Sequence, residues 1–234
     1  MKYLISFFLL TPILIFSQIT EDISRDTPSV VKKLYTKGSF MYGPGTEEVW
    51  VATKYYQDSD KDPEDIYMRP GGGFGIEAVI GYDVTRFLSF ELALGWLTSG
   101  EVIDKDNMAI LEKFPLQAII LYRIPINKKF TPYIGGGLAT LLSIKYTEKV
   151  QGTESDVIYS KPIGFTILGG TEFKKSQSPW YWFGELRYNI LGEYTVKEAT
   201  MGGRTVTGII QGSSLDNLNA NGVFIVFGVG YYLK

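Results

Sequence analysis

The sequence predicts an all-β fold: an antiparallel up-and-down transmembrane β-barrel of eight strands, with short periplasmic turns and long extracellular loops. Apolar side chains alternate with small or polar ones over runs of about ten residues, the length that a tilted strand needs to cross a bilayer. Short and long connections between these runs alternate along the chain, and aromatic residues gather at the ends of the runs. All three features are typical of transmembrane barrels.

The clearest alternation lies in Gly73–Trp96, where two runs are joined by the short polar connection Asp83–Arg86. Successive side chains of a strand point to opposite faces of its sheet. One face of this hairpin is small or polar and carries Glu77 and Glu91. The other face is apolar, and it would meet lipid in a transmembrane barrel but form the core of a soluble one. The apolar face comprises Phe74, Ile76, Ala78, Ile80, Tyr82, Leu88, Phe90, Leu92, Leu94 and Trp96.

The amino-terminal residues differ from the rest of the chain. Met1–Ser17 are expected to be a cleaved secretory signal peptide, because a lysine precedes the apolar stretch Leu4–Phe16 and a serine stands at the cleavage site. An anchoring helix is the alternative, but the apolar stretch is too short to span a bilayer. The polar residues 18–32 are predicted to form a periplasmic leader, so that the barrel comprises residues 33–234.

The other strands follow the same pattern in order along the chain. Their predicted bounds are Lys33–Gly43, Phe114–Ile124, Phe130–Tyr146, Lys161–Phe173, Trp180–Tyr194 and Gly222–Leu233. The predicted connections are short near residues 84, 126 and 176 and long at 44–70, 98–110, 147–157 and 197–221. Eight strands place both ends of the barrel on the periplasmic side, as a secreted chain with a periplasmic leader requires. A further run at Val49–Tyr56 leaves a ten-stranded barrel open as an alternative.

Continuing the alternation along the strands places a set of charged side chains on the inner face of the barrel. Each would cost up to about 2–4 kcal/mol if it faced lipid at mid-bilayer, and carboxylates less, which supports the inward assignment. Because an eight-stranded barrel is only just wide enough for its own side chains, we interpret the set as a plug of ion pairs. A charged conduit or gate is the alternative. The predicted lumen network comprises Glu77, Glu91, Arg123, Glu172, Glu185 and Arg187.

Aromatic residues near the strand ends are expected to form girdles at the two membrane–water interfaces. The predicted girdle comprises Tyr82, Trp96, Tyr122, Trp180, Trp182 and Tyr231. At the loop end, Tyr42, Tyr146 and Tyr194 are expected to lie with Trp96. Packing in the core of a soluble barrel is the alternative, and it explains the clustering at strand ends less well.

The composition argues against catalysis and cofactor binding. The chain has no histidine, which the lipases, acyltransferases and proteases that use similar barrels need as a general base or partner. It has no cysteine, and its net charge of −2 offers no basic field for nucleic acid. The acidic segment Asp58–Asp62 resembles the opening of a calcium-binding loop, but Pro63 and Arg69 stand where that loop needs glycine and glutamate. We therefore expect no enzyme activity, no cofactor and no metal site.

The last strand carries a resemblance to a known family. Gly228, Tyr231 and Leu233 are similar in spacing to the carboxyl-terminal signal by which outer-membrane barrels are recognised for insertion, although leucine stands where an aromatic residue is usual. With the passages GYDVTRFLSFELALGW and KKFTPYIGGGLAT, the chain resembles the small eight-stranded outer-membrane β-barrels, the OmpA/OmpX-like or "porin family" barrels of Bacteroidota. These passages are patterns that specify a family and not a function.

The resemblance implies the outer membrane of a Gram-negative bacterium as the location. It implies outer-membrane lipid and lipopolysaccharide as partners, and the barrel-assembly machinery as a partner during insertion. We expect a structural, adhesive or loop-mediated recognition role, with a side-chain-plugged lumen and an extracellular ligand that no residue identifies. The alternatives are a small pore or conduit for ions or hydrophobic solutes, and a soluble periplasmic lipid-binding barrel.

Overall fold

The computed structural model describes residues 33–54, 64–104, 107–124, 126, 129–150, 153–174, 178–201, 204–206 and 215–233. The expected signal peptide and periplasmic leader, and the acidic segment Asp58–Asp62, lie outside these residues. In the described ranges, no helix is both long and apolar enough to cross a membrane.

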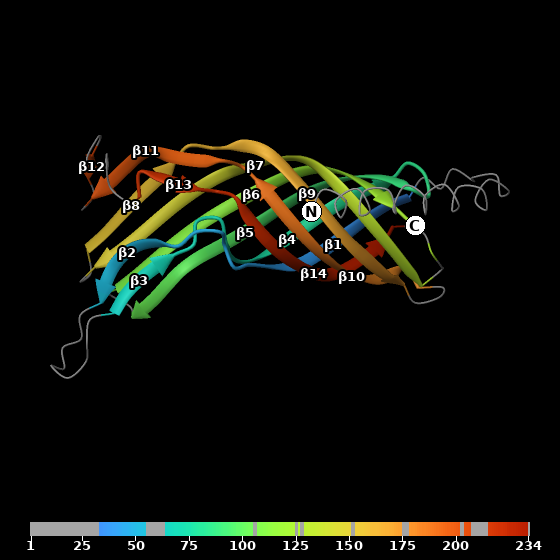
Figure 1. The fold of residues 1–234 in the computed structure, drawn as a ribbon, viewed down its shortest axis with the longest axis horizontal. Coiled ribbons are helices and arrows are strands. Elements are labelled where there is room, and N and C mark those ends of the chain that lie inside the picture. Colours follow the sequence, from blue (N-terminus) through green and yellow to red (C-terminus); the bar gives the residue numbers. More distant parts are fainter. Residues whose placement is uncertain are drawn as a thin grey trace, which may run out of the picture. The chain divides into compact units, whose positions relative to one another are not determined.

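Eight antiparallel strands close into a barrel, which confirms the predicted fold class (Figure 1). Each barrel strand pairs with the next barrel strand along the chain, and the last pairs with the first. The barrel strands are β1 (Lys33–Gly43), β4 (Gly73–Asp83), β5 (Leu88–Asp104), β6 (Asn107–Arg123), β7 (Phe130–Val150), β9 (Ile163–Lys174), β10 (Trp180–Ile190) and β14 (Gly222–Tyr232).

The alternation read from the sequence separates an apolar outside from a packed inside. On β4, Phe74, Ile76 and Ile80 are each about half exposed, whereas Glu77 and Val79 on the opposite face are buried. The same division holds along β1, β10 and β14. Large apolar side chains thus cover the outside of the barrel, a surface that suits lipid and that a soluble protein rarely exposes.

Six further strands gather at the end of the barrel away from its short connections (Figure 1). β8 and β11 extend the sheet beyond β7, β12 and β13 both pair with β11, and β2 pairs with β3. We call β8, β11, β12 and β13, with the loop-side ends of β5 to β7, the outer extension. The six strands are β2 (Val49–Lys54), β3 (Glu64–Met68), β8 (Thr153–Tyr159), β11 (Glu193–Met201), β12 (Arg204–Val206) and β13 (Asn217–Asn219).

The outer extension corrects three predicted loops. Residues 98–110 belong largely to β5 and β6, residues 147–157 to β7 and β8, and part of 197–221 to β11, β12 and β13. The prediction was wrong because it ended each strand where the apolar alternation ends. Outside the bilayer the outward face of a strand can be polar, so backbone pairing continues without the apolar alternation that lipid imposes.

Two other predictions are also resolved by the structure. The predicted strand Trp180–Tyr194 is interrupted at Leu191–Gly192, where Gly192 adopts a φ of 75°, so that β11 begins at Glu193. The run at Val49–Tyr56 forms β2, which pairs only with β3 in the described part of the chain. A ten-stranded barrel is therefore excluded.

Candidate functional site

The inside of the barrel holds a chain of buried ionic and aromatic contacts. The structure places all six residues of the predicted lumen network on the inner face, each no more than 5% exposed. It brings them together in three groups, which lie one after another along the barrel. The groups centre on Arg187, on the pair of Lys37 with Glu91, and on Arg123.

Arg187 of β10 holds the group nearest the loop end. Its Nη1 donates to Glu77 Oε2 at 2.6 Å, and its Nε donates to Glu185 Oε1 at 2.8 Å. Nη1 also donates to Gln117 Oε1 at 2.7 Å, and the Tyr133 hydroxyl donates to Glu185 Oε2 at 3.0 Å. One guanidinium therefore neutralises part of the charge of two carboxylates that are removed from water.

Lys37 of β1 supplies a second cation beside this group. Its ammonium pairs with Glu91, whose Oε1 also accepts from the Tyr35 hydroxyl at 2.7 Å. The same ammonium lies 4.9 Å from the ring centroid of Phe183 and 5.3 Å from that of Tyr133. Such cation–π contacts add to an ion pair whose two side chains are each 1% exposed.

Arg123 of β6 holds the group at the turn end. Its Nη1 lies 2.5 Å from Asp83 Oδ1, and its Nε donates to Glu172 Oε1 at 3.0 Å. Lys174 completes the group, with its Nζ 2.8 Å from Glu172 Oε2. The Arg123 guanidinium also lies over the Tyr35 ring, so this group is continuous with the Lys37–Glu91 pair.

Lumen glycines make room for the tyrosine rings between the groups. A Cβ on Gly81 would lie 2.2 Å from Tyr35 Cζ, and one on Gly230 would lie 2.1 Å from Tyr181 Cζ. Both tyrosines are almost completely buried. The two rings therefore occupy the space that side chains at the glycine positions would otherwise fill.

We expect Gly230→Ala to destabilise the barrel by about 1–3 kcal/mol, because its methyl group would displace the Tyr181 ring from a packed interior. Urea unfolding in detergent micelles, followed by tryptophan fluorescence, measures this change. Gly184→Ala on β10 is the matched control, since no described atom lies within 4 Å of its added Cβ. Equal stability of the two variants would contradict tight packing around Tyr181.

Sequence reasoning missed three charged residues that form ion pairs with the predicted lumen network. Lys37 lies on the same face of β1 as the buried Tyr35, and the apolar Phe40 lies on the other face. The alternation along this strand could therefore have identified Lys37 as an inward residue. The sequence pattern assigns Asp83 to a turn, but this residue is the last of β4 and faces inward. Lys174 lies one residue beyond the predicted end of its strand.

A short segment after β3 lies at the loop end of the lumen. Lys113 of β6 is 2% exposed, and its ammonium donates to the carbonyl oxygen of Pro70 at 2.6 Å and to that of Gly72. Pro70, Gly71 and Gly72 are all buried. A Cβ on Gly71 would lie 1.7 Å from the carbonyl oxygen of Asn221. The segment is therefore packed against the residue that precedes β14 and is bound to β6 by Lys113.

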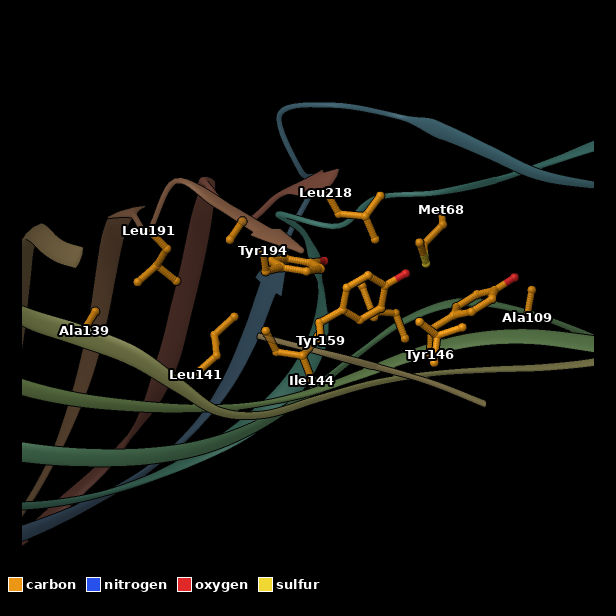
Figure 2. Packing of buried hydrophobic residues seen from close by; sticks show 13 residues of the cluster. Met68, Ala109, Ala139, Leu141, Ile144, Tyr146, Tyr159, Leu191, Tyr194 and Leu218 are labelled. Atoms are coloured by element: carbon orange, nitrogen blue, oxygen red, sulfur yellow. The ribbon is translucent and has the colours of Figure 1, made fainter. Parts of the chain in front are cut away.

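An apolar cluster fills the inner side of the outer extension (Figure 2). It includes Tyr146 and Tyr194, at 1% and 0% exposure, so their predicted place in the outer girdle is wrong. Both belong to the buried cluster of the outer extension, in which β8 pairs with β7 on one side and with β11 on the other. Tyr194 meets Tyr159 edge to face at a centroid distance of 5.0 Å, and Tyr159 donates to the carbonyl oxygen of Leu215 at 3.2 Å. Burial raises the pKa of the Tyr159 and Tyr194 hydroxyls, which stay uncharged.

The predicted girdle residues lie near both ends of the apolar outside. At the turn end Tyr82, Tyr122, Trp180 and Trp182 are exposed, and Trp180 contacts Tyr231 at a centroid distance of 4.7 Å. At the loop end Trp96 is half-buried, and its Nε1 donates to Glu112 Oε1 at 3.2 Å.

The predicted insertion signal divides between the two faces of β14 and the residue after it. Gly228 is buried on the inner face, whereas Tyr231 and Leu233 lie on the outer face. A Cβ on Gly228 would lie 2.2 Å from the carbonyl oxygen of Gly38, so a glycine is needed for the close approach of β1. In the described residues, no group of three histidine, cysteine or acidic side chains could hold a metal ion.

Comparison with known proteins gives a family match. Residues 80–209, more than half of the chain, match the model of a family described as Opacity family porin protein. Protein opa of Haemophilus influenzae is 32% identical over 82 residues, which are 34% of this chain and 63% of that protein. The chain thus matches less than two thirds of the length of that relative.

Solved outer-membrane proteins share the fold. OprG from Pseudomonas aeruginosa has a TM-score of 0.55 at 12% identity, covering 87% of this chain and 96% of that chain. AlkL in lipid bilayers has a TM-score of 0.52 at 13% identity, covering 90% and 94%. At these identities the likeness concerns the fold alone. The finer resemblance to OmpA/OmpX-like barrels of Bacteroidota stays a prediction.

Proposed function

Because the chain belongs to the Opacity family of porin proteins, we propose that it is a non-catalytic barrel with a plugged lumen that acts through its extracellular end. The protein is an outer-membrane barrel of a Gram-negative bacterium. This location excludes the soluble periplasmic alternative. A structural, adhesive or recognition role then falls to the outer extension and the loops that join its strands.

The observation that carries the proposal is the continuity of the buried contacts from one end of the lumen to the other. Arg123, Tyr35, Glu91 and Lys37 are joined in series, and the Lys37 ammonium lies over the Tyr133 ring. The Tyr133 hydroxyl in turn binds Glu185 of the Arg187 group. An eight-stranded barrel has little room beyond its own side chains, so such a series supports a closed lumen.

The loop end supports the same proposal. Above the Arg187 group lie the Pro70–Gly72 segment held by Lys113 and then the apolar cluster of the outer extension. An ion would have to break ion pairs and also cross an apolar layer, and both steps are costly. The absence of histidine supports a role without catalysis.

Planar-bilayer conductance tests the plug. We expect the refolded wild-type protein to be silent, and Glu185→Gln/Arg187→Gln to show openings, because the variant replaces a buried ion pair by two neutral amides. The matched control is Glu48→Gln/Arg69→Gln, which changes a half-exposed ion pair outside the barrel wall. Steady, ion-selective openings of the wild-type protein would contradict the plug and favour a small pore.

A further inference from the structure

A groove of about 520 Å³ lies outside the barrel wall at its loop end. Three neighbouring strands form its back, since Tyr42 of β1 pairs with Phe74 of β4 and Phe74 pairs with Thr98 of β5. Residues of β3 and of the segments that flank the β2–β3 hairpin form its other wall. The groove is separate from the lumen network, so a ligand bound in it would serve a role beyond the proposed function.

The back of the groove continues the apolar outside of the barrel. Its paired residues are Tyr42, Phe74 and Thr98. The next outward-facing set of paired residues toward the turn end is Phe40, Ile76 and Trp96. The Phe40 and Phe74 rings stack with their centroids 6.4 Å apart. Leu34, at the turn end of the same face of β1, is eight residues from Tyr42, or about 26 Å along the strand and roughly 20 Å along a barrel axis tilted by about 40°. This distance is close to the height of the apolar band of membrane barrels, about 25 Å. The groove therefore lies where the acyl region gives way to the headgroup region.

The opposite wall is polar and carries a net negative charge. Arg69 donates through Nε to Glu48 Oε1 at 2.9 Å, and both side chains are about half exposed. Asp65 adds a second carboxylate, with its Oδ1 accepting from Trp50 Nε1 at 3.2 Å. On the back of the groove, Ser99 of β5 has a buried Oγ with no hydrogen-bond partner among the described residues.

Glycines give this corner of the barrel its shape. Gly73 and Gly100 line the groove with φ angles of 134° and 125°, and nearby Gly45 has a φ of 78°. Residues with a side chain rarely adopt such angles. A Cβ on Gly45 would also lie 2.9 Å from Arg69 Cβ. The backbone is therefore adapted to hold the polar wall where it stands.

We propose that this groove binds the uncharged sugar headgroup of an outer-leaflet glycolipid, whose acyl chains lie along the outer face of β1 and β4. The exposed rings of Tyr42, Phe74 and Tyr67 offer flat apolar faces to the C–H faces of a sugar. Carboxylates accept hydrogen bonds from sugar hydroxyls, and the guanidinium of Arg69 donates to their oxygens. The second carboxylate disfavours headgroups that bear only phosphate or carboxylate.

Native mass spectrometry of the full-length protein, released from phosphatidylcholine nanodiscs, tests this proposal. The nanodiscs contain equal small fractions of a glucosyl-diacylglycerol, the corresponding phosphatidylglycerol and the corresponding phosphatidylethanolamine. We expect one glucosyl lipid to be retained in preference to the others by about tenfold, as one or two additional hydrogen bonds would give. Equal retention, or preference for either phospholipid, would overturn the proposal.

Variants locate the site, and competition by a soluble sugar tests whether the bound sugar must belong to a lipid. Asp65→Ala and Tyr67→Ala should each reduce the preference several-fold. The first removes a hydrogen-bond acceptor from the opposite wall of the groove, and the second removes an aromatic ring from it. Phe165→Ala is the matched control, since this exposed aromatic residue lies on β9 at the opposite side of the ring of strands. Soluble maltose should not compete at millimolar concentration, and displacement of the lipid by maltose would overturn the assignment to a membrane lipid. Loss of preference in Phe165→Ala alone would overturn the location.

Discussion

Arg187→Met should destabilise the barrel by about 3–5 kcal/mol, because it leaves two buried carboxylates without their guanidinium. Glu77 and Glu185 are each 5% exposed, and their charges have little access to water. The change can be measured by guanidinium unfolding in detergent micelles, or by the temperature at which the unboiled protein loses its folded gel band.

Two further variants show whether the loss comes from uncompensated charge. Arg187→Met combined with Glu77→Gln and Glu185→Gln should recover most of the stability, because it removes the buried charges together. Arg69→Met breaks the half-exposed pair with Glu48 and should cost only about 0–1 kcal/mol. If Arg187→Met were as mild as Arg69→Met, the lumen would have to be hydrated and the plug would be refuted.

The sequence predicted which side chains enter the lumen better than it predicted their partners. Alternation belongs to each strand by itself, so the inward position of Glu77 or Arg187 can be read locally. Their pairing depends on the register of the closed sheet, which joins residues 110 positions apart. Lys113 shows what such local reasoning cannot predict. Its acceptors are carbonyl oxygens of a segment whose position no sequence pattern indicates.

The outer extension was missed for a different reason. Apolar and polar side chains alternate clearly in the membrane-spanning strands, because the face of each strand that contacts lipid must be apolar. In β8 and β11 that requirement is absent, and polar residues such as Asp156 and Glu198 occur along the strand without marking its faces. The buried positions Tyr146, Tyr159 and Tyr194 were visible only as aromatic residues near strand ends, which membrane girdles also predict.

Tyr194→Ala should open the outer extension while the barrel stays folded. Tyr194 is fully buried in the apolar cluster, and loss of a large aromatic side chain from such a site costs about 3–5 kcal/mol. β8, β11, β12 and β13 take no part in the ring of barrel strands, so this cost can be relieved by local unfolding. Limited proteolysis on intact cells should then cleave within residues 153–219, with the folded gel band of the barrel core retained.

Conservative variants separate the ring from its hydroxyl. Among the described residues no group hydrogen-bonds to Tyr194 Oη, so Tyr194→Phe should leave protease resistance unchanged or slightly improved. Tyr159→Phe removes the bond to the Leu215 carbonyl oxygen and should cost about 0.5–1.5 kcal/mol. Loss of the whole barrel in Tyr194→Ala would instead show that the extension and the barrel unfold as one unit. In that case the recognition role could not be assigned to a separately stable outer layer.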